Sequence, residues 1–455
     1  MLGRMKKRSC FSLLLASRIL TSAMAPGWTR RLLAAASLSL AVAAAFSTLP
    51  RVVQSQGRGG PIGSRPPEVP PVIGQPLETR EAVGRGQRPA FTGQTRAVST
   101  ATKAPIEVKV VARGLRAPWA IAFLPGGRQM LITERVGALR VVSVDGAIGP
   151  EISGVPPVVL GGDAGLLDIV LDPAFATNRL IYFCYVEQRD RGNGLTLARA
   201  RLSDNFGALE NLAFILRVEP SPSNNAHFGS RLLFDRQGKL LVSVGERFTD
   251  DVRVQAQDLK SPLGKILRIN TDGTPAPGNP FASTSGARAD VWAYGLRNPQ
   301  GLTFHPVTGA LWETEHGPRG GDEVNIIEPG KNYGWPLIAY GIEYSGRPVN
   351  GGLTAQTGME QPVYYWDPAI APSGATFYSA DAVPEWKNNL FVAAHAGQHL
   401  ARLVFEGQRV VGEERLLLDQ RQRMRDVRQG PDAALWVVTD DQNDGRLIRL
   451  SAKGR

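Results

Sequence analysis

Short runs of alternating apolar and polar residues recur along the chain from about residue 105 onward. In each copy, an apolar run leads into a turn rich in Asp, Pro and Gly, and a second β-rich run follows that often ends in an acid. Two runs of this kind around a tight turn are typical of a β-hairpin. The copies begin at Ile121, Ile169, Leu232, Leu302, Ala375 and Val427.

The spacing of these hairpins indicates the architecture. From Pro125 in the first turn to Pro431 in the last, the copies follow one another at intervals of about 61 residues. Four short strands with their loops fill such a period, so the sequence predicts an all-β, six-bladed β-propeller. A further strand-like run from Ile106 can pair with the last blade and close the ring. A double β-sandwich is the alternative, but it does not account for six similar turns.

The composition supports a turn-rich β-protein, since 50 Gly and 33 Pro are many for 455 residues. The net charge of +11 at first suggests a nucleic-acid-binding protein. Residues 1–104, however, hold 15 Lys and Arg against 3 Asp and Glu, whereas residues 105–455 hold 37 against 38. The basic character belongs to the N-terminal segment, so we expect no nucleic-acid partner.

The first 50 residues resemble an export signal. Arg30 and Arg31 precede the apolar run 32–46, which is short for a membrane span and typical of a signal peptide. An uncleaved N-terminal anchor is the alternative for residues 1–50, and Met24 is an alternative start. The protein is therefore expected to be periplasmic or secreted, without membrane insertion beyond such an anchor.

Residues 51–104 are rich in Pro, Gly, Gln, Ser and Arg and show little hydrophobic periodicity, so they predict a disordered linker. Residues 105–455 then form the propeller domain. Cys10 lies in the leader and Cys184 in an apolar run, which leaves no disulfide within the mature chain. Cys184 is therefore predicted to be a core residue.

The densest cluster of polar residues lies between Tyr294 and Pro336. Arg, Asn, Gln, His, Asp and Glu stand there among Gly-Pro turns around one short strand, 309–315. This pattern suits a site for an anionic, carbonyl-bearing ligand and a hard cation. Outside this stretch, His227 precedes a strand, and Gly229 beside it permits close backbone approach. A lone histidine is more often structural, so its flanking residues must decide its role.

Arg423 and Arg425 alternate in the run RMRDV and therefore point to the same side of a strand. Two guanidinium groups on one side suggest a carboxylate or phosphate ligand, and salt bridges to neighbouring blades are the alternative. The five histidines form no zinc-binding set. The sequence also contains neither a nucleotide-type phosphate loop nor a nucleophile elbow, so those classes are not expected.

Several motifs occur in consistent order across most of the domain: GLLDIVLDPAF, HFGSRL, LRNPQGL, EHGPRGGDEVNII with KNYGWP, APSG and RMRDV. As a set, they resemble the soluble quinoprotein sugar dehydrogenase family of the glucose/sorbosone type, which uses pyrroloquinoline quinone. The resemblance covers residues 105–450 and implies a six-bladed propeller, in agreement with the repeat count.

The resemblance also implies roles for individual residues. His227 is similar to the general base that takes the proton from the substrate hydroxyl, and Arg297 to the cation that stabilises charge on the quinone carbonyl. Gly317 and Pro318 match positions whose backbone carbonyls bind a catalytic calcium ion. The further matches are cofactor-binding residues at Asp163, Arg297, Asn298, Gln300, Arg423 and Arg425, and a second, structural calcium site at Glu323 and Tyr333.

Three positions depart from the family pattern. Asp163 stands where Gln is common and adds a carboxylate near a tricarboxylate cofactor. Ala396 stands in place of a Lys or Arg, a loss worth about 1.5–3 kcal/mol of cofactor binding, with a protonated His395 as a partial substitute. Ala226 precedes His227 where some relatives have Asp, so the base could lack an orienting partner.

These observations predict an exported, calcium- and quinone-dependent dehydrogenase that oxidises the anomeric hydroxyl of aldoses to lactones. No CxxCH motif is present to hold a covalent haem, so electrons are expected to pass to a separate acceptor. One alternative is a propeller that has lost quinone binding and binds a carbohydrate or a protein, which Asp163 and Ala396 favour. Another is a calcium-dependent lactonase, which would need carboxylate and Asn ligands converging on one metal.

Overall fold

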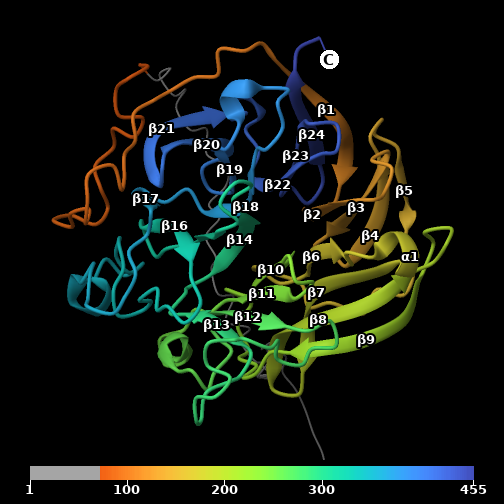
Figure 1. Cartoon of the computed structure of the whole chain (residues 1–455), viewed down its shortest axis with the longest axis horizontal. Coiled ribbons are helices and arrows are strands. Elements are labelled where there is room, and N and C mark those ends of the chain that lie inside the picture. Colours follow the sequence, from red (N-terminus) through yellow and green to blue (C-terminus); the bar gives the residue numbers. More distant parts are fainter. Residues whose placement is uncertain (1–71, 455) are drawn as a thin grey trace, which may run out of the picture. The chain divides into compact units, whose positions relative to one another are not determined.

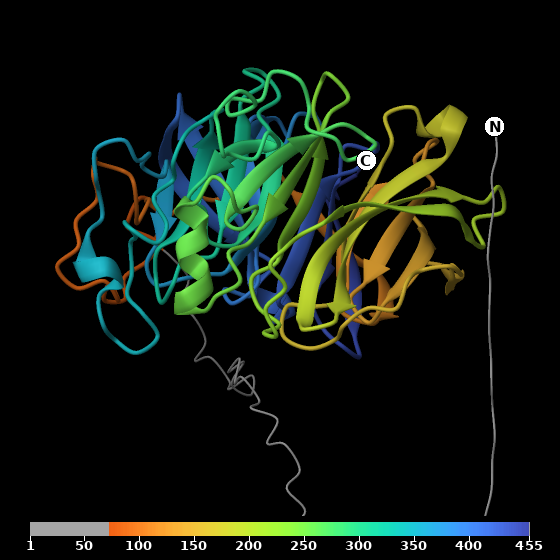
Figure 2. The same ribbon diagram turned by 90° about the horizontal axis from the view of Figure 1, so that it is seen from below.

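The computed structural model describes residues 72–454, whose strands form six four-stranded antiparallel sheets. The sheets stand around a common axis (Figure 1), and their strands run between the two mouths of the central channel (Figure 2). The innermost strands of neighbouring blades pack against each other all the way round the ring. The predicted all-β, six-bladed β-propeller is confirmed.

Five blades consist of consecutive strands, with the first strand of each innermost. The first three are β2 (Pro118–Phe123), β3 (Gln129–Glu134), β4 (Ala138–Ser143) and β5 (Ile148–Glu151); β6 (Leu166–Leu171), β7 (Leu180–Arg189), β8 (Gly192–Leu202) and β9 (Leu209–Arg217); and β10 (Gly229–Phe234), β11 (Leu240–Val244), β12 (Lys265–Ile269) and β13 (Val291–Tyr294). The next two are β14 (Pro299–Phe304), β15 (Leu311–Glu315), β16 (Asp322–Ile327) and β17 (Tyr364–Trp366); and β18 (Pro372–Phe377), β19 (Leu390–Ala394), β20 (His399–Glu406) and β21 (Arg409–Leu416). The helices are α1 (Phe175–Asn178), α2 (Asp250–Arg253), η1 (Val254–Gln257), η2 (Val349–Gly352), η3 (Pro384–Trp386) and η4 (Leu418–Gln420).

The sixth blade joins the two ends of the propeller. It contains β22 (Met424–Gln429), β23 (Leu435–Thr439) and β24 (Gly445–Ala452), and its outermost strand is β1 (Ile106–Leu115). Antiparallel pairing of β1 with β24 closes the ring, as the sequence predicts.

Burial explains why the second strands of the blades are the most apolar segments. Every residue of β11, β15, β19 and β23 is buried, because neighbouring strands flank them and the adjacent blades cover both faces. Cys184 on β7 is fully buried, which confirms its predicted place in the core. The six predicted hairpins are the first and second strands of the six blades.

The hairpins also determine where a site can form. Because the first two strands of each blade are antiparallel, the start of the first strand and the end of the second meet at the same mouth of the channel. The loops at this mouth carry the residues just before β6, β10, β14 and β22 and just after β11, β15, β19 and β23. Most of the predicted site residues fall in these positions.

The prediction of a disordered linker over residues 51–104 is wrong for residues 72–104. Gln94 is fully buried, and its side-chain amide donates to the carbonyl of Pro362 at 2.8 Å. The carboxylate of Asp367 accepts hydrogen bonds from two backbone N–H groups of this segment at 2.9 Å each. The segment lies along the side of the molecule that carries β17 and β21 (Figure 1). These are polar contacts without hydrophobic periodicity, which is why the sequence pattern did not indicate them.

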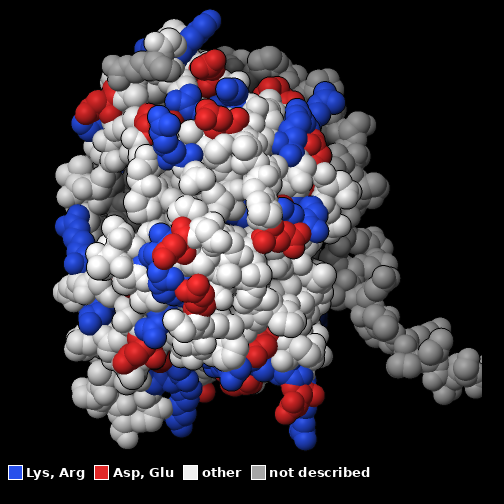
Figure 3. All heavy atoms as spheres, turned by 90° about the vertical axis from the view of Figure 1, so that its right-hand side faces the viewer, with Lys and Arg blue, Asp and Glu red and all other residues white. Residues whose placement is uncertain are grey.

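The expected signal peptide or anchor, residues 1–50, and the linker up to residue 71 lie outside the described residues. On the face seen in Figure 3, Lys and Arg are interspersed with Asp and Glu, in keeping with the balanced charge of residues 105–455. Within residues 72–454, no helix reaches the length and hydropathy of a membrane span.

Candidate active site

His227 lies at the channel mouth just before β10, with a left-handed backbone (φ 52°). Its ring Nδ1 is 2.7 Å from the carboxylate Oε2 of Glu246, which is fully buried. Burial alone would raise the pKa of Glu246, but His227 and Arg297 lower it overall. A ring that carries its proton on Nδ1 donates it to this carboxylate, and Nε2 is then an acceptor. His227 thus has a carboxylate partner, and the expectation that it could lack an orienting partner is wrong.

Sequence reasoning missed Glu246, although the repeat carries a signal for it. In five of the six hairpins, the second strand ends in an acid or is followed by one within two residues. These acids are Glu134, Asp190, Glu246, Glu315 and Asp440. Glu315 shows one use of such an acid, because its Oε2 accepts the backbone N–H groups of Arg297 at 2.5 Å and of Asn298 at 3.2 Å.

Asp163 supports His227 from the neighbouring blade. Its Oδ2 accepts the backbone N–H of His227 at 3.0 Å, so the carboxylate is used to hold the loop that carries the base. Arg247 and Arg423 both experience its negative charge. The extra carboxylate that the sequence shows at this position is thus accompanied by cations.

Arg297 and Asn298 lie just before β14 and are both buried. The Arg297 guanidinium carbon lies 5.0 Å from the centre of the Trp335 ring, which holds the side chain by a cation–π contact. Asn298 Oδ1 accepts the backbone N–H of Gly229 at 3.0 Å. A Cβ at Gly229 would come within 2.7 Å of the Gly245 nitrogen, so the predicted close backbone approach at this glycine is observed.

Arg423 and Arg425 meet at the same mouth around His395, as the alternation in RMRDV predicts. Arg423 Nη2 donates to His395 Nδ1 at 2.6 Å, and His395 Nε2 donates to the carboxylate of Asp440. Arg425 Nη2 forms an ion pair with the same carboxylate at 3.0 Å. Burial and Arg425 lower the pKa of His395 well below its usual value. His395 is therefore neutral, and the expectation that it replaces the cation missing at Ala396 is wrong.

Two backbone carbonyls converge on one cationic group beside the predicted calcium position. Arg297 Nη1 donates to the backbone carbonyl oxygens of His316 at 2.9 Å and Gly317 at 2.6 Å, so both carbonyls face a positive charge at the mouth. Pro318 follows directly and is buried. Among residues 72–454, no three His, Cys, Asp or Glu side chains are grouped to hold a metal. Carbonyl oxygens are thus the hard-cation ligands that this region offers.

The groups predicted for a second calcium site, the Glu323 carboxylate and the Tyr333 main-chain carbonyl, lie on β16 and in the loop after it. Glu323 lies opposite Glu315 in the β15–β16 pair, and burial together with Asp322 raises its pKa to about 8. The Tyr333 hydroxyl donates to the carbonyl of Ile326 at 2.7 Å and is fixed within the blade.

Five of the buried polar atoms that have no hydrogen-bond partner among residues 72–454 lie at the mouth that carries His227. They are Arg297 Nε, Asn298 Nδ2, His316 Nε2, Arg425 Nε and the acceptor Glu246 Oε1. Buried donors are rarely left unpaired in proteins, so such a group is typical of a site that awaits a ligand. Four of the five are nitrogens, and carbonyl and carboxylate oxygens are the groups that would satisfy them.

A chain of contacts leads from this mouth into the channel. Gln300 Oε1 accepts Arg425 Nη1 at 2.9 Å, and its backbone oxygen accepts Arg231 Nε at 2.9 Å. Arg231 Nη1 lies 3.1 Å from both Asp168 Oδ1 and Asp426 Oδ1.

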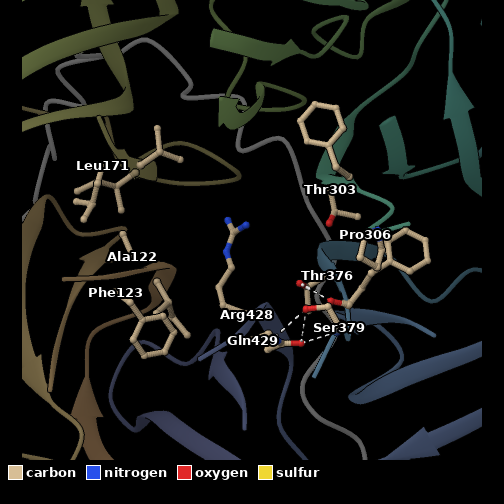
Figure 4. Close-up of a pocket in the computed structure, with 14 residues that line it drawn as sticks. Ala122, Phe123, Leu171, Thr303, Pro306, Thr376, Ser379, Arg428 and Gln429 are labelled. Carbon is tan, nitrogen blue, oxygen red and sulfur yellow. Dashed lines mark hydrogen bonds between the residues drawn. The ribbon is translucent and has the colours of Figure 1, made fainter. Parts of the chain in front are cut away.

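Arg428 bonds to the same two carboxylates at 3.4 and 3.0 Å, and we call these four residues, Arg231, Arg428, Asp168 and Asp426, the inner charge layer. Arg428 also lines a cavity of about 450 Å³ at the opposite mouth, mostly among apolar side chains (Figure 4). The charge of Arg428 in this cavity is compensated by the carboxylates of Asp168 and Asp426.

The comparison with known proteins agrees with these observations. A family model described as Glucose / Sorbosone dehydrogenase matches residues 115–449. The chain belongs to this family. This chain is 43% identical to an aldose sugar dehydrogenase of Escherichia coli, over 78% of this chain and 95% of that protein.

Solved structures of family members have the same fold. The apo-form of the soluble aldose sugar dehydrogenase from E. coli aligns with a TM-score of 0.73 and 42% identity, covering 76% of this chain and 100% of that one. A pyrroloquinoline quinone-bound aldose sugar dehydrogenase from Streptomyces coelicolor aligns with a TM-score of 0.63 and 31% identity, covering 77% of this chain and 99% of that one.

Proposed function

We propose that this protein is an exported dehydrogenase that oxidises the anomeric hydroxyl of aldose sugars to lactones, using pyrroloquinoline quinone and calcium. One observation carries the proposal. Of the three arginines Arg297, Arg423 and Arg425 at the His227 mouth, only Arg425 is ion-paired with a carboxylate among the described residues, that of Asp440. The hydrogen-bond partners of the three include carbonyl oxygens, an amide and a neutral imidazole. Buried and half-buried cations with neutral partners favour an anionic ligand, and a quinone with three carboxylates is one.

The unpaired nitrogens fit this group in number and kind. Arg297 Nε, Asn298 Nδ2 and the Gln300 side chain would bind carbonyl oxygens of the quinone ring system, and Arg423 and Arg425 would hold its carboxylates. When bound, pyrroloquinoline quinone supplies the two-electron acceptor of the oxidation. The pyrroloquinoline quinone-bound form of the S. coelicolor relative supports this cofactor for the family.

His227 and Glu246 provide the proton chemistry. With its Nδ1 proton held by Glu246, the neutral ring accepts the proton of the anomeric hydroxyl at Nε2. Glu246 then stabilises the resulting imidazolium, as an ionised carboxylate does beside a general base. Asp163 holds the backbone of His227 in place while the proton moves.

Calcium would be held by the main-chain carbonyls of Gly317 and Pro318. Gly317 already presents its carbonyl to a positive group, which is the behaviour that a hard cation requires. A second ion at Glu323 and Tyr333 would have a structural role. Electrons would leave to a separate acceptor, because the sequence holds no haem-attachment motif.

The test is reduction of a redox dye by the full chain, with added quinone and calcium, over a panel of aldoses. We expect saturable, calcium-dependent activity that falls by about 10²–10⁴-fold in His227→Ala. Activity that does not depend on quinone would contradict the proposal. Absence of oxidation with a folded protein would favour the binding propeller, and sugar-lactone hydrolysis without an acceptor would favour the lactonase.

A further inference from the structure

Two aromatic side chains near His227 are left exposed by the other residues of the described range, 72–454. Phe248 is 40% exposed, and its ring meets the His227 ring edge to face, with 5.0 Å between centroids. Tyr344 is 64% exposed, and its ring centroid lies 6.3 Å from that of Phe248. We call Phe248 and Tyr344 the aromatic shelf. Large exposed rings next to a proton acceptor indicate a binding surface rather than a part of the core.

The backbone under Phe248 is strained, and a buried arginine maintains it. Arg247 and Phe248 both have positive φ values, 71° and 74°, which is unfavourable for bulky residues. Arg247 is 2% exposed and donates to the carbonyls of Asn193 at 2.9 Å and Asn224 at 2.6 Å. Its guanidinium also lies 4.2 Å from the centre of the Phe228 ring. Strain that is maintained by such a network, and that presents a ring to solvent, is typical of functional sites.

Tyr344 is held next to Phe248 by an ion pair between distant segments. Arg253 on α2 forms hydrogen bonds of 2.9 and 3.2 Å with the two carboxylate oxygens of Glu343, the residue before Tyr344. The Arg253 guanidinium also lies 5.3 Å from the centre of the Trp335 ring. The two rings of the shelf therefore come from two loops that the Arg253–Glu343 ion pair connects, and this ion pair fixes the distance between the rings.

The surroundings indicate the chemistry of the ligand. Asp251, Val252 and Gln255, which follow Phe248 closely in the chain, line a groove of about 880 Å³, although neither ring of the shelf lines it. Three arginines and four acids line this groove, so it favours neither an anionic nor a strongly apolar ligand. Sugar rings combine an apolar C–H face with a rim of hydroxyl groups. Such a ring can place its apolar face on an aromatic side chain and its hydroxyls among charged groups.

We propose that the aromatic shelf binds a carbohydrate of at least two rings. Phe248 contacts the ring whose anomeric hydroxyl faces His227, and Tyr344 contacts the next glycosyl unit. The proposal rests on the proposed function for the identity of the oxidised ring. It makes the reducing end of a disaccharide or longer glycan a better substrate than a monosaccharide, and it assigns specificity to loops that carry no readable signal in the sequence.

The two rings predict different effects, which makes the test sharp. In the full chain with quinone and calcium, Phe248→Ala should lower kcat/KM about 3- to 10-fold for both glucose and cellobiose. Tyr344→Ala should lower it by a similar factor for cellobiose only, and Tyr344→Phe should retain the wild-type ratio. Phe214→Ala, at a 48% exposed ring on β9 away from the shelf, is the matched control and should change neither.

A change in Tyr344→Ala that is equal for both sugars, or absent for both, would overturn the proposal. A second measurement separates it from the proposed function: saturation-transfer NMR of cellobiose with the cofactor-free full chain. If no aldose is oxidised, but transfer is strong in the wild type and lost in the Phe248→Ala/Tyr344→Ala variant, the enzyme assignment fails and the shelf stands. Transfer that persists in the folded double variant refutes the shelf, whatever the enzyme activity.

Discussion

The two ends of the channel both contain arginines, but these arginines meet different partners. In the inner charge layer, Arg231 and Arg428 each face the carboxylates of Asp168 and Asp426. At the His227 mouth, Arg297 faces backbone carbonyls, and Arg423 faces the neutral ring of His395.

The difference teaches how to separate structural from functional arginines in one fold. A buried cation costs free energy unless an anion compensates it. The inner charge layer contains its own compensation and therefore stabilises the channel wall as a unit. At the mouth, Arg297 and Arg423 face neutral acceptors and several buried polar atoms have no hydrogen-bond partner among the described residues, which favours the proposed anionic ligand. The same residue type is structural in one place and available for binding in the other.

The largest expected effect comes from breaking the inner charge layer. Arg231 is fully buried, so Arg231→Met leaves Asp168 and Asp426 with Arg428 as their remaining ion-pair partner. We expect the free energy of unfolding to fall by about 3–5 kcal/mol, measured by denaturant titration. The matched control is Arg423→Met at the mouth, which should change it by less than about 1 kcal/mol. Equal losses in the two variants would show that the mouth is as fully compensated as the layer.

A second variant removes the carboxylate of Glu246, which contacts His227. In Glu246→Gln, the amide cannot stabilise a protonated His227, so kcat should fall by about 10²-fold with little change in the unfolding midpoint. Glu107→Gln on β1, exposed and distant, is the control. An unchanged kcat would mean that the short contact with His227 serves the fold alone.

A smaller effect is expected for Asp440, the carboxylate that is ion-paired with Arg425. Burial would raise the pKa of Asp440, but Arg425 and the hydrogen bond from His395 hold it well below its usual value. A lowered pKa means that Asp440 stabilises the fold above the pH at which an unfolded Asp ionises, about 3.9, and that this contribution is lost as the pH falls further. Asp440→Asn should therefore lose about 1.5–3 kcal/mol at pH 7.

The same variant should also lose less stability on acidification than the wild type, as unfolding midpoints between about pH 6 and pH 2 would show. Parallel pH curves for the two proteins would contradict the assignment of the lowered pKa to Asp440.

The fold could be predicted because the sequence repeats one hairpin pattern six times. Six hairpins with similar turns and a spare strand at Ile106 are local patterns, and the structure confirms all of them. The segment 72–104 was misinterpreted because it is held by amide and carboxylate contacts, such as Gln94 to Pro362. Such contacts join residues far apart in the chain and leave no periodic trace.

The residues of the candidate site that belong to sequence motifs could be predicted. The contacts that depend on how separate loops come together in space could not. His227, Arg297 and the Arg423/Arg425 pair were found from their sequence context. Glu246 was missed because its role comes from the distance between two loops. His395 was interpreted as a cation because the sequence does not show how deeply two neighbouring arginines and burial depress its pKa.

The central claim is that the mouth arginines, unlike those of the inner charge layer, await an anionic cofactor. Calorimetric titration of pyrroloquinoline quinone with saturating calcium into the full chain tests it most directly. Arg425 and Arg428 lie three residues apart on β22 and form a matched pair. We predict that Arg425→Met weakens the Kd about 10- to 100-fold, whereas folded Arg428→Met retains the wild-type Kd. Equal affinities in the two variants, or no binding by the folded wild type at about tens of micromolar quinone, would contradict the account.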